Sequence, residues 1–132
     1  MKTAMSERIK LTQGTGPTAL HYEIIPVGND WLILLTGGDA HIGCTAIGDD
    51  GRLSSYTPQS HKDDALAIPL AKKISQTFSC VCTVVAGFHL DGITREQIDE
   101  VVANSNIGIT RILAAIEEKT NECGIGNTGS SI

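Results

Sequence analysis

Three of the four histidines stand beside aspartates in short polar segments between apolar stretches. These segments are residues 37–41 (GGDAH), 60–64 (SHKDD) and 89–91 (HLD). Imidazole and carboxylate groups together can ligate a divalent metal, act as a general acid and base, or hold a polar ligand. The residue types alone leave these three chemistries open.

Each segment also has an ordinary structural explanation. Gly38 and Asp39 are typical turn residues, and Asp63 or Asp64 is a typical N-cap of a helix. The whole set favours a functional site, because structural loops seldom bring three histidines and several carboxylates to one edge of a sheet.

The elements that position these segments follow from the hydrophobic pattern. Alternating apolar and polar residues predict strands at residues 8–12 and 20–24, and the continuous apolar run at 31–35 predicts a central strand covered on both faces. Two more strands are expected at residues 41–47 and 52–56. Because short glycine-containing turns separate them, we predict that these five strands form a meander.

The second half of the chain has helical periodicity. Apolar residues recur every four positions from Leu66 to Ile74 and predict a helix that ends near Phe78. Pro69 implies that this helix starts near Ala67 or is kinked in its early turns.

An apolar stretch at residues 81–88 predicts a sixth strand, and residues 94–97 (TREQ) match a capping box that opens a long amphipathic helix. The apolar positions of that helix form a broad arc: Ile98, Val101, Val102, Ile109, Ile112, Leu113 and Ile116. Since one sheet face cannot cover the whole arc, we predict a homodimer.

These elements predict one domain over residues 1–132, with residues 124–132 as a frayed tail. The fold class is α/β (α+β), with a mostly antiparallel sheet of about six strands and two helices in the order ββββ(β)αβα. Strand directions in a meander place the segments at 37–41 and 60–64 at one end of the sheet. The sixth strand returns to that end, so we predict that His41, His61 and His89 share one pocket.

Composition excludes several functions. The 132 residues carry 10 basic and 15 acidic side chains, a net charge of −5, without the basic cluster that nucleic-acid binding needs. No apolar run is long enough to span a membrane or to act as a signal peptide, so we expect a cytoplasmic protein. Four cysteines without a C-x-x-C pair indicate reduced, mostly buried thiols.

Residues 36–43 (TGGDAHIG), 61–64 (HKDD) and 87–94 (GFHLDGIT) resemble the prenylated-flavin chaperone-like family. That family includes a small accessory protein associated with gallate and other hydroxyarylic acid decarboxylases. The resemblance implies a fold similar to proteasome assembly chaperones. It also implies an accessory protein that helps a UbiD-type aromatic acid decarboxylase acquire or mature its prenylated flavin mononucleotide (FMN), without being the decarboxylase.

Under this resemblance the motif residues form the cofactor site, for prenylated FMN or FMN. Helix N-termini and glycine-rich turns would hold the phosphate, and the histidines would face the flavin or ribityl groups. The candidate binding residues are Gly37, Gly38, Asp39, His41, His61, Asp63, Asp64, His89, Asp91 and Thr94.

Two other functions stay open at this point. One is a small divalent-metal-dependent enzyme in which His41, His61 and His89, together with nearby aspartates, hold the ion and activate water. The other is a purely structural assembly chaperone for which the histidines are dispensable.

Overall fold

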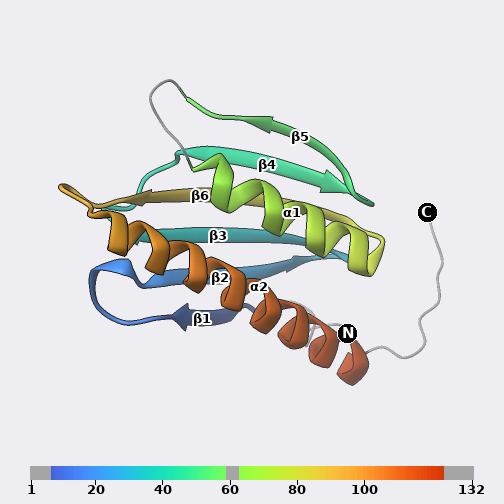
Figure 1. Cartoon of the computed structure of the whole chain (residues 1–132). Coiled ribbons are helices and arrows are strands. Elements are labelled where there is room, and N and C mark those ends of the chain that lie inside the picture. The colour runs from blue at the N-terminus through green and yellow to red at the C-terminus, as the bar shows by residue number, and fades with distance from the viewer. Residues whose placement is uncertain (1–6, 59–62, 124–132) are drawn as a thin grey trace.

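The apolar stretches form strands where the sequence predicts them. In the computed structural model, which describes residues 7–58 and 63–123, six strands make one sheet (Figure 1). The strands are β1 (Ile9–Gln13), β2 (Leu20–Val27), β3 (Asp30–Gly38), β4 (Cys44–Asp49), β5 (Arg52–Tyr56) and β6 (Val81–His89), and a short 3-10 helix, η2 (Gly16–Thr18), follows β1. The expected start of the fourth strand at His41 is wrong, because residues 41–43 form a loop.

Helix α1 (Asp64–Phe78) begins before Pro69 and contains it, so the expectation of a start near Ala67 is wrong. Pro69 is the sixth residue of α1, beyond the first turn, so the helix lacks the hydrogen bond that this position would otherwise donate to the carbonyl of Ala65. Helix α2 (Arg95–Cys123) opens with the predicted capping box. The backbone N–H of Gln97 donates to Thr94 Oγ1 at 3.1 Å, and the N–H of Thr94 donates to Gln97 Oε1 at 3.0 Å.

The strand order is β1-β2-β3-β6-β4-β5, so the predicted meander is wrong. Strand β6 lies between β3 and β4, parallel to β3 and antiparallel to β4. Its inward residues Cys82, Val84 and Ala86 are fully buried, which explains why this strand takes a central place. The other pairings are antiparallel, so the prediction of a mostly antiparallel sheet with two helices is confirmed.

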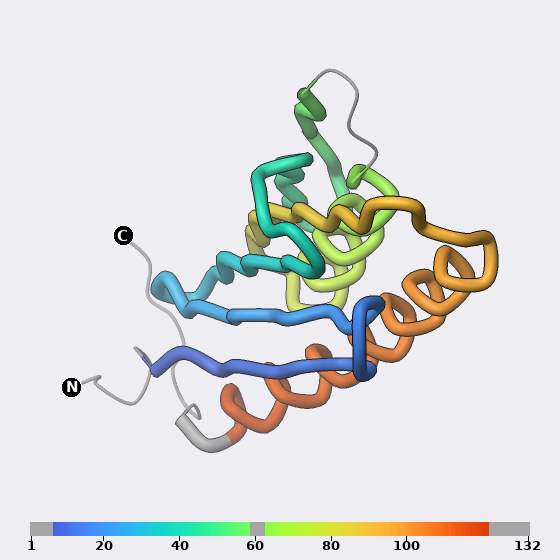
Figure 2. Tube along the Cα trace, turned by 90° about the vertical axis from the view of Figure 1, so that its left-hand side faces the viewer, coloured from blue at the N-terminus to red at the C-terminus, as the bar shows by residue number. Residues whose placement is uncertain are grey.

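Both helices lie on one face of the sheet (Figure 2). On that face Trp31, Ile33 and Leu35 of β3 are buried, whereas the alternate residues Leu32 and Leu34 are only half-buried. The expectation that this strand is covered on both faces is therefore wrong for the described residues. The inward side chains of β2, β3, β4 and β6 form one core with both helices.

The ends of β3 and β6 are tied together where the candidate site begins. The backbone N–H of Asp39 donates to the carbonyl of His89 at 2.9 Å. Gly38 has a φ of 60°, and a Cβ there would collide with the His89 carbonyl, so only glycine fits this approach. Strand β4 runs opposite to β3, as predicted, although the strand order differs. His41 and His89 therefore lie at the same end of the sheet, as the sequence predicts.

Candidate functional site

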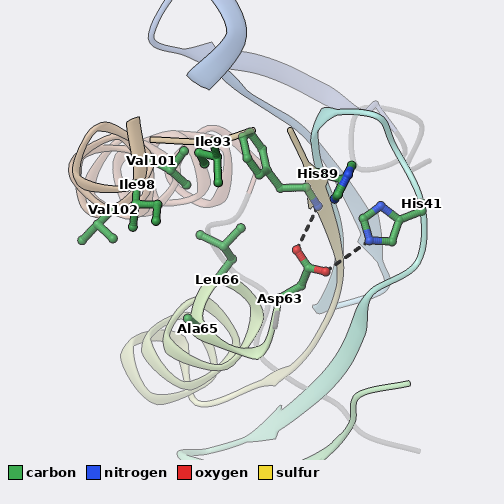
Figure 3. Close-up of a pocket in the computed structure, with 10 residues that line it drawn as sticks. His41, Asp63, Ala65, Leu66, His89, Ile93, Ile98, Val101 and Val102 are labelled. Atoms are coloured by element: carbon green, nitrogen blue, oxygen red, sulfur yellow. Dashed lines mark hydrogen bonds and ion pairs between the residues drawn. The ribbon is translucent and has the colours of Figure 1, made fainter. Parts of the chain in front are cut away.

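A pocket of about 400 Å³ lies between the N-terminal parts of α1 and α2 at the end of β6 (Figure 3). One end is polar and the rest is apolar. Its lining residues are His41, Asp63, Ala65, Leu66, Phe88, His89, Ile93, Ile98, Val101 and Val102. Volumes of this order are typical of small-molecule sites.

Asp63 is the buried acidic group of this pocket, with 6% of its surface exposed. It stands at the N-cap of α1, but its side chain makes no capping hydrogen bond. Instead Oδ1 accepts the backbone N–H of Phe88 at 2.9 Å, and Oδ2 lies 3.2 Å from His41 Nε2. The carboxylate therefore joins α1, β6 and the loop after β3, a role that a simple helix cap does not have.

His41 faces acceptors on both sides of its ring. Nδ1 lies 2.9 Å from the carbonyl oxygen of Asp39, and Nε2 lies against the Asp63 carboxylate. The two contacts hold the ring between the Asp39 carbonyl and the Asp63 carboxylate. The contact with His41 Nε2 offsets part of the cost of burying the Asp63 carboxylate.

Two glycines leave the space in which this arrangement forms. A Cβ on Gly43 would collide with the Asp63 carboxylate, and a Cβ on Gly87 would collide with the carbonyl of His41. The backbone of the loop before β4 therefore lies in direct contact with the backbone of β6. Both glycines stand in the motifs that carry the family resemblance.

A second polar group lies at the exposed rim. His89 Nε2 is 2.8 Å from Asp91 Oδ1, and Asp39 is close enough that one ligand atom from each of the three residues lies within 4.8 Å of the others. All three side chains are exposed, so the ion pair itself contributes little to stability. One imidazole and two carboxylates are a donor set that divalent transition metals accept.

The apolar wall is the part of the pocket that the sequence prediction missed. Ile98, Val101 and Val102 come from the first turns of α2, Ile93 comes from the loop just before it, and Ala65 and Leu66 come from α1 (Figure 3). The signal was the broad apolar arc of α2, which we interpreted as a dimer surface. Ile112 and Ile116 of that arc are buried against the chain's own core, whereas Ile98 and Val102 stay exposed beside the pocket.

The other predicted site residues have different places. Thr94 is used in the capping box of α2, and Asp64 is exposed in the first turn of α1. Gly37 packs against Phe88 beneath the pocket. The structure thus brings His41, Asp63 and His89 into one pocket, with Asp39 and Asp91 at its rim. His61 lies outside the described residues, as does the predicted tail at 124–132.

Comparison with protein families matches residues 14–117 to the prenylated flavin chaperone LpdD-like domain. The chain belongs to this family. The matched range contains every residue that lines the pocket, and it also contains the three motifs that carry the resemblance.

This prenylated flavin chaperone LpdD-like chain is also similar to two individual proteins. Protein LpdD of Lactiplantibacillus plantarum is 33% identical over 79 residues, which is 54% of this chain and 58% of that protein. The match therefore spans little more than half the length of this relative. A chain of a novel chaperone complex for yeast 20S proteasome assembly has a TM-score of 0.59 at 16% identity, over 86% of this chain and 96% of that one. This second likeness shows the fold alone.

Within the described residues, neither helix combines the length and the apolarity that crossing a membrane needs.

Proposed function

We propose that this chain is a non-catalytic accessory protein that binds prenylated FMN, or FMN, in the pocket between α1 and α2. In this role it helps a UbiD-type aromatic acid decarboxylase in the cytoplasm acquire or mature its cofactor. The observation that carries the proposal is the two-part pocket, with an aliphatic wall and a polar end, in a chain of the prenylated flavin chaperone LpdD-like family.

The aliphatic wall suits the prenyl-derived part of such a ligand. Five of its side chains are Leu66, Ile93, Ile98, Val101 and Val102. Among the described residues of the lining, Phe88 is the only phenylalanine, tyrosine or tryptophan, so the pocket offers little stacking for a flavin ring. Apolar contact with an aliphatic group would therefore supply more of the binding free energy than stacking does.

The polar end suits the oxygen-rich part of the ligand. The N-terminus of α2 carries positive partial charge, and His89 lies on the same side of the pocket. Asp39 and Asp91 oppose an anion there because both carboxylates are exposed at the rim. A divalent cation would reduce this repulsion, so binding of a phosphorylated ligand should increase when the cation is added.

Binding measurements test this function. FMN and prenylated FMN are titrated, with and without Mg²⁺, into the wild type and into His41→Ala, His89→Ala and a control, His21→Ala. His21 is an exposed histidine of β2 that lines no part of this pocket. We expect the two pocket variants to bind at least about tenfold more weakly, which corresponds to about 1.4 kcal/mol, and the control to bind as the wild type does.

A second readout follows the transfer itself. A UbiD-type decarboxylase is matured with prenylated FMN in the presence of the wild type or the double variant His41→Ala/His89→Ala, and its activity on an aromatic acid is measured. The proposal fails if neither flavin binds and the double variant supports maturation as well as the wild type. Turnover of an aromatic acid by the isolated chain would also contradict it.

Metal binding is the second candidate, favoured by the cluster of Asp39, His89 and Asp91. Elemental analysis of protein purified without a tag, and titration with Mn²⁺ or Zn²⁺, test it directly. We expect Asp91→Asn to weaken binding because it removes one anionic ligand, whereas Asp49→Asn, in an exposed ion pair on β4, should not. Absence of metal together with no measurable titration would exclude this function.

A further inference from the structure

The face of the sheet opposite the helices is uncharged in its middle. Strand register places two rows of outward residues across β2, β3, β6 and β4. In one row Ile25 is beside Leu32, Leu32 beside Thr83, and Thr83 beside Ile47. In the other row Glu23 stands at the β2 position beside Leu34, and the uncharged part follows, with Leu34 beside Val85 and Val85 beside Thr45. We call the seven uncharged residues the open face.

The open face has no cover among the described residues. Both helices lie on the other side of the sheet (Figures 1 and 2). Six of the seven side chains are half-buried by their strand neighbours alone, and Ile47 is 42% exposed. A contiguous apolar surface of this kind on a small protein typically marks an interface.

Charged residues border the open face. Glu23 is paired with Arg8 and lies beside Lys10 on the β1–β2 side, and Asp49 is paired with Arg52 on the β4–β5 side. An apolar centre with a polar rim is the usual anatomy of a protein interface. The lack of charge in the centre argues against an anionic membrane or a nucleic acid as the occupant.

The charge distribution favours a second copy on this face. The chain has a net charge of −5, yet the charged residues named at the border of the open face are three basic and two acidic ones. Part of the acidic excess lies on α2, whose sequence has six acidic residues against three basic ones, Arg95, Arg111 and Lys119. Two copies that met through α2 would bring these charges together, whereas copies that meet through the sheets keep them on opposite outer sides.

The outer side of the whole sheet, which is the open face together with its charged border, is large enough for a dimer. Six strands of five to nine residues, spaced about 4.8 Å apart and rising about 3.3 Å per residue, present roughly 700 Å² in projection. A stable interface buries about 800 Å² of accessible surface per partner. Since pleated side chains have more accessible surface than their projection, the sheet is large enough.

We propose that two copies of this chain pair through their open faces, sheet against sheet, to form a homodimer with the helices outside. Aliphatic sheet faces pack in this way at a spacing of about 10 Å. The pairing leaves the pocket between α1 and α2 accessible on each copy. In this proposal the dimer surface is the open face and not the apolar arc of α2. The proposal does not depend on which ligand the pocket binds.

The test compares two substitutions of equal chemistry on the two sides of the molecule. Ile47→Lys places a charge on the open face, and Ile107→Lys places one on α2, where the side chain is 49% exposed. Thr83→Lys adds a charge to the open face without removing an apolar side chain, in case Ile47→Lys does not fold. Circular dichroism checks the fold, and light scattering and sedimentation equilibrium measure the mass.

We expect wild type and Ile107→Lys to have twice the 14.0 kDa mass of one chain. Both open-face variants should have a dimer dissociation constant raised at least about tenfold. A wild type that stays monomeric up to about 100 µM overturns the proposal, even if a decarboxylase subunit then proves to bind this face. The proposal is also overturned if both open-face variants remain dimeric, or if Ile107→Lys dissociates the dimer.

Discussion

The buried carboxylate of Asp63 and the ring of His41 meet at 3.2 Å across 22 residues of sequence. Asp63 begins α1, and His41 lies in the loop that leads from β3 to β4, so their contact connects the helix layer to the edge of the sheet. The same carboxylate also accepts the N–H of Phe88. The pocket's polar end is thus built around one acidic group that bonds to two other segments.

Replacing Asp63 should destabilise the fold. Asp63→Ala leaves the part-buried N–H of Phe88 without its acceptor, so we expect the free energy of unfolding to fall by about 2 kcal/mol. Asp64→Ala, at the exposed neighbouring position, should lower it by no more than about 0.5 kcal/mol. Urea unfolding of both variants measures the difference. Equal midpoints for the two would mean that the Asp63 contacts contribute nothing to stability.

The apolar wall should distinguish the two flavins. Val102 is 52% exposed beside the pocket, and Val102→Lys puts a charge where an aliphatic group would bind. We expect this variant to lose affinity for prenylated FMN more than for FMN, because only the former has the aliphatic addition. Ile107→Lys, on the same helix but outside the lining, should bind both as the wild type does. An equal loss for the two flavins in calorimetry would place the aliphatic group elsewhere.

Thr94 should prove to be a structural residue of the helix start. Its hydroxyl accepts the N–H of Gln97, so Thr94→Ala should lower the free energy of unfolding by about 1 kcal/mol. Thr110→Ala, at an exposed position within α2, should cost nothing because alanine is the better helix former. Thermal and urea unfolding check both values. If Thr94→Ala instead abolishes flavin binding without loss of stability, Thr94 is a ligand contact.

Stability should fall in alkaline solution. Burial raises the pKa of the Cys82 thiol from 9.0 to about 12, and burial likewise raises the pKa of the Tyr22 hydroxyl from 10.0 to about 12. The unfolded chain therefore releases these protons first, and the stabilisation is complete below pH 9.0 and is lost as the pH rises towards 12.

The Cys82 contribution can be measured by substitution. Cys82→Ala lacks the ionisable group, so the drop in free energy of unfolding between pH 8 and about pH 11 should be smaller than in the wild type. The two proteins are compared by the change in free energy of unfolding between the two pH values. Its absolute value is not used, because Cys82→Ala also packs less well and is less stable at every pH. A drop of unchanged size would show that the Cys82 thiol does not contribute to it.

Local patterns were sufficient for much of the fold. The alternating and continuous apolar stretches predicted six strands, and the TREQ sequence predicted the capping box between Thr94 and Gln97. Strand direction also followed from the sequence, because each short turn reverses the chain. For that reason the sequence correctly predicts that His41 and His89 lie at one end of the sheet.

What the sequence by itself determined is therefore the type of each element, the direction in which it runs and the end at which its polar residues lie. Only the tertiary structure decided that β6 inserts between β3 and β4, that Asp63 bonds to His41 and Phe88, and that the start of α2 forms an apolar wall. Periodicity records which face of an element is apolar, but many partners can cover that face equally well. The choice among them depends on the burial of all elements together, which no local stretch of sequence contains.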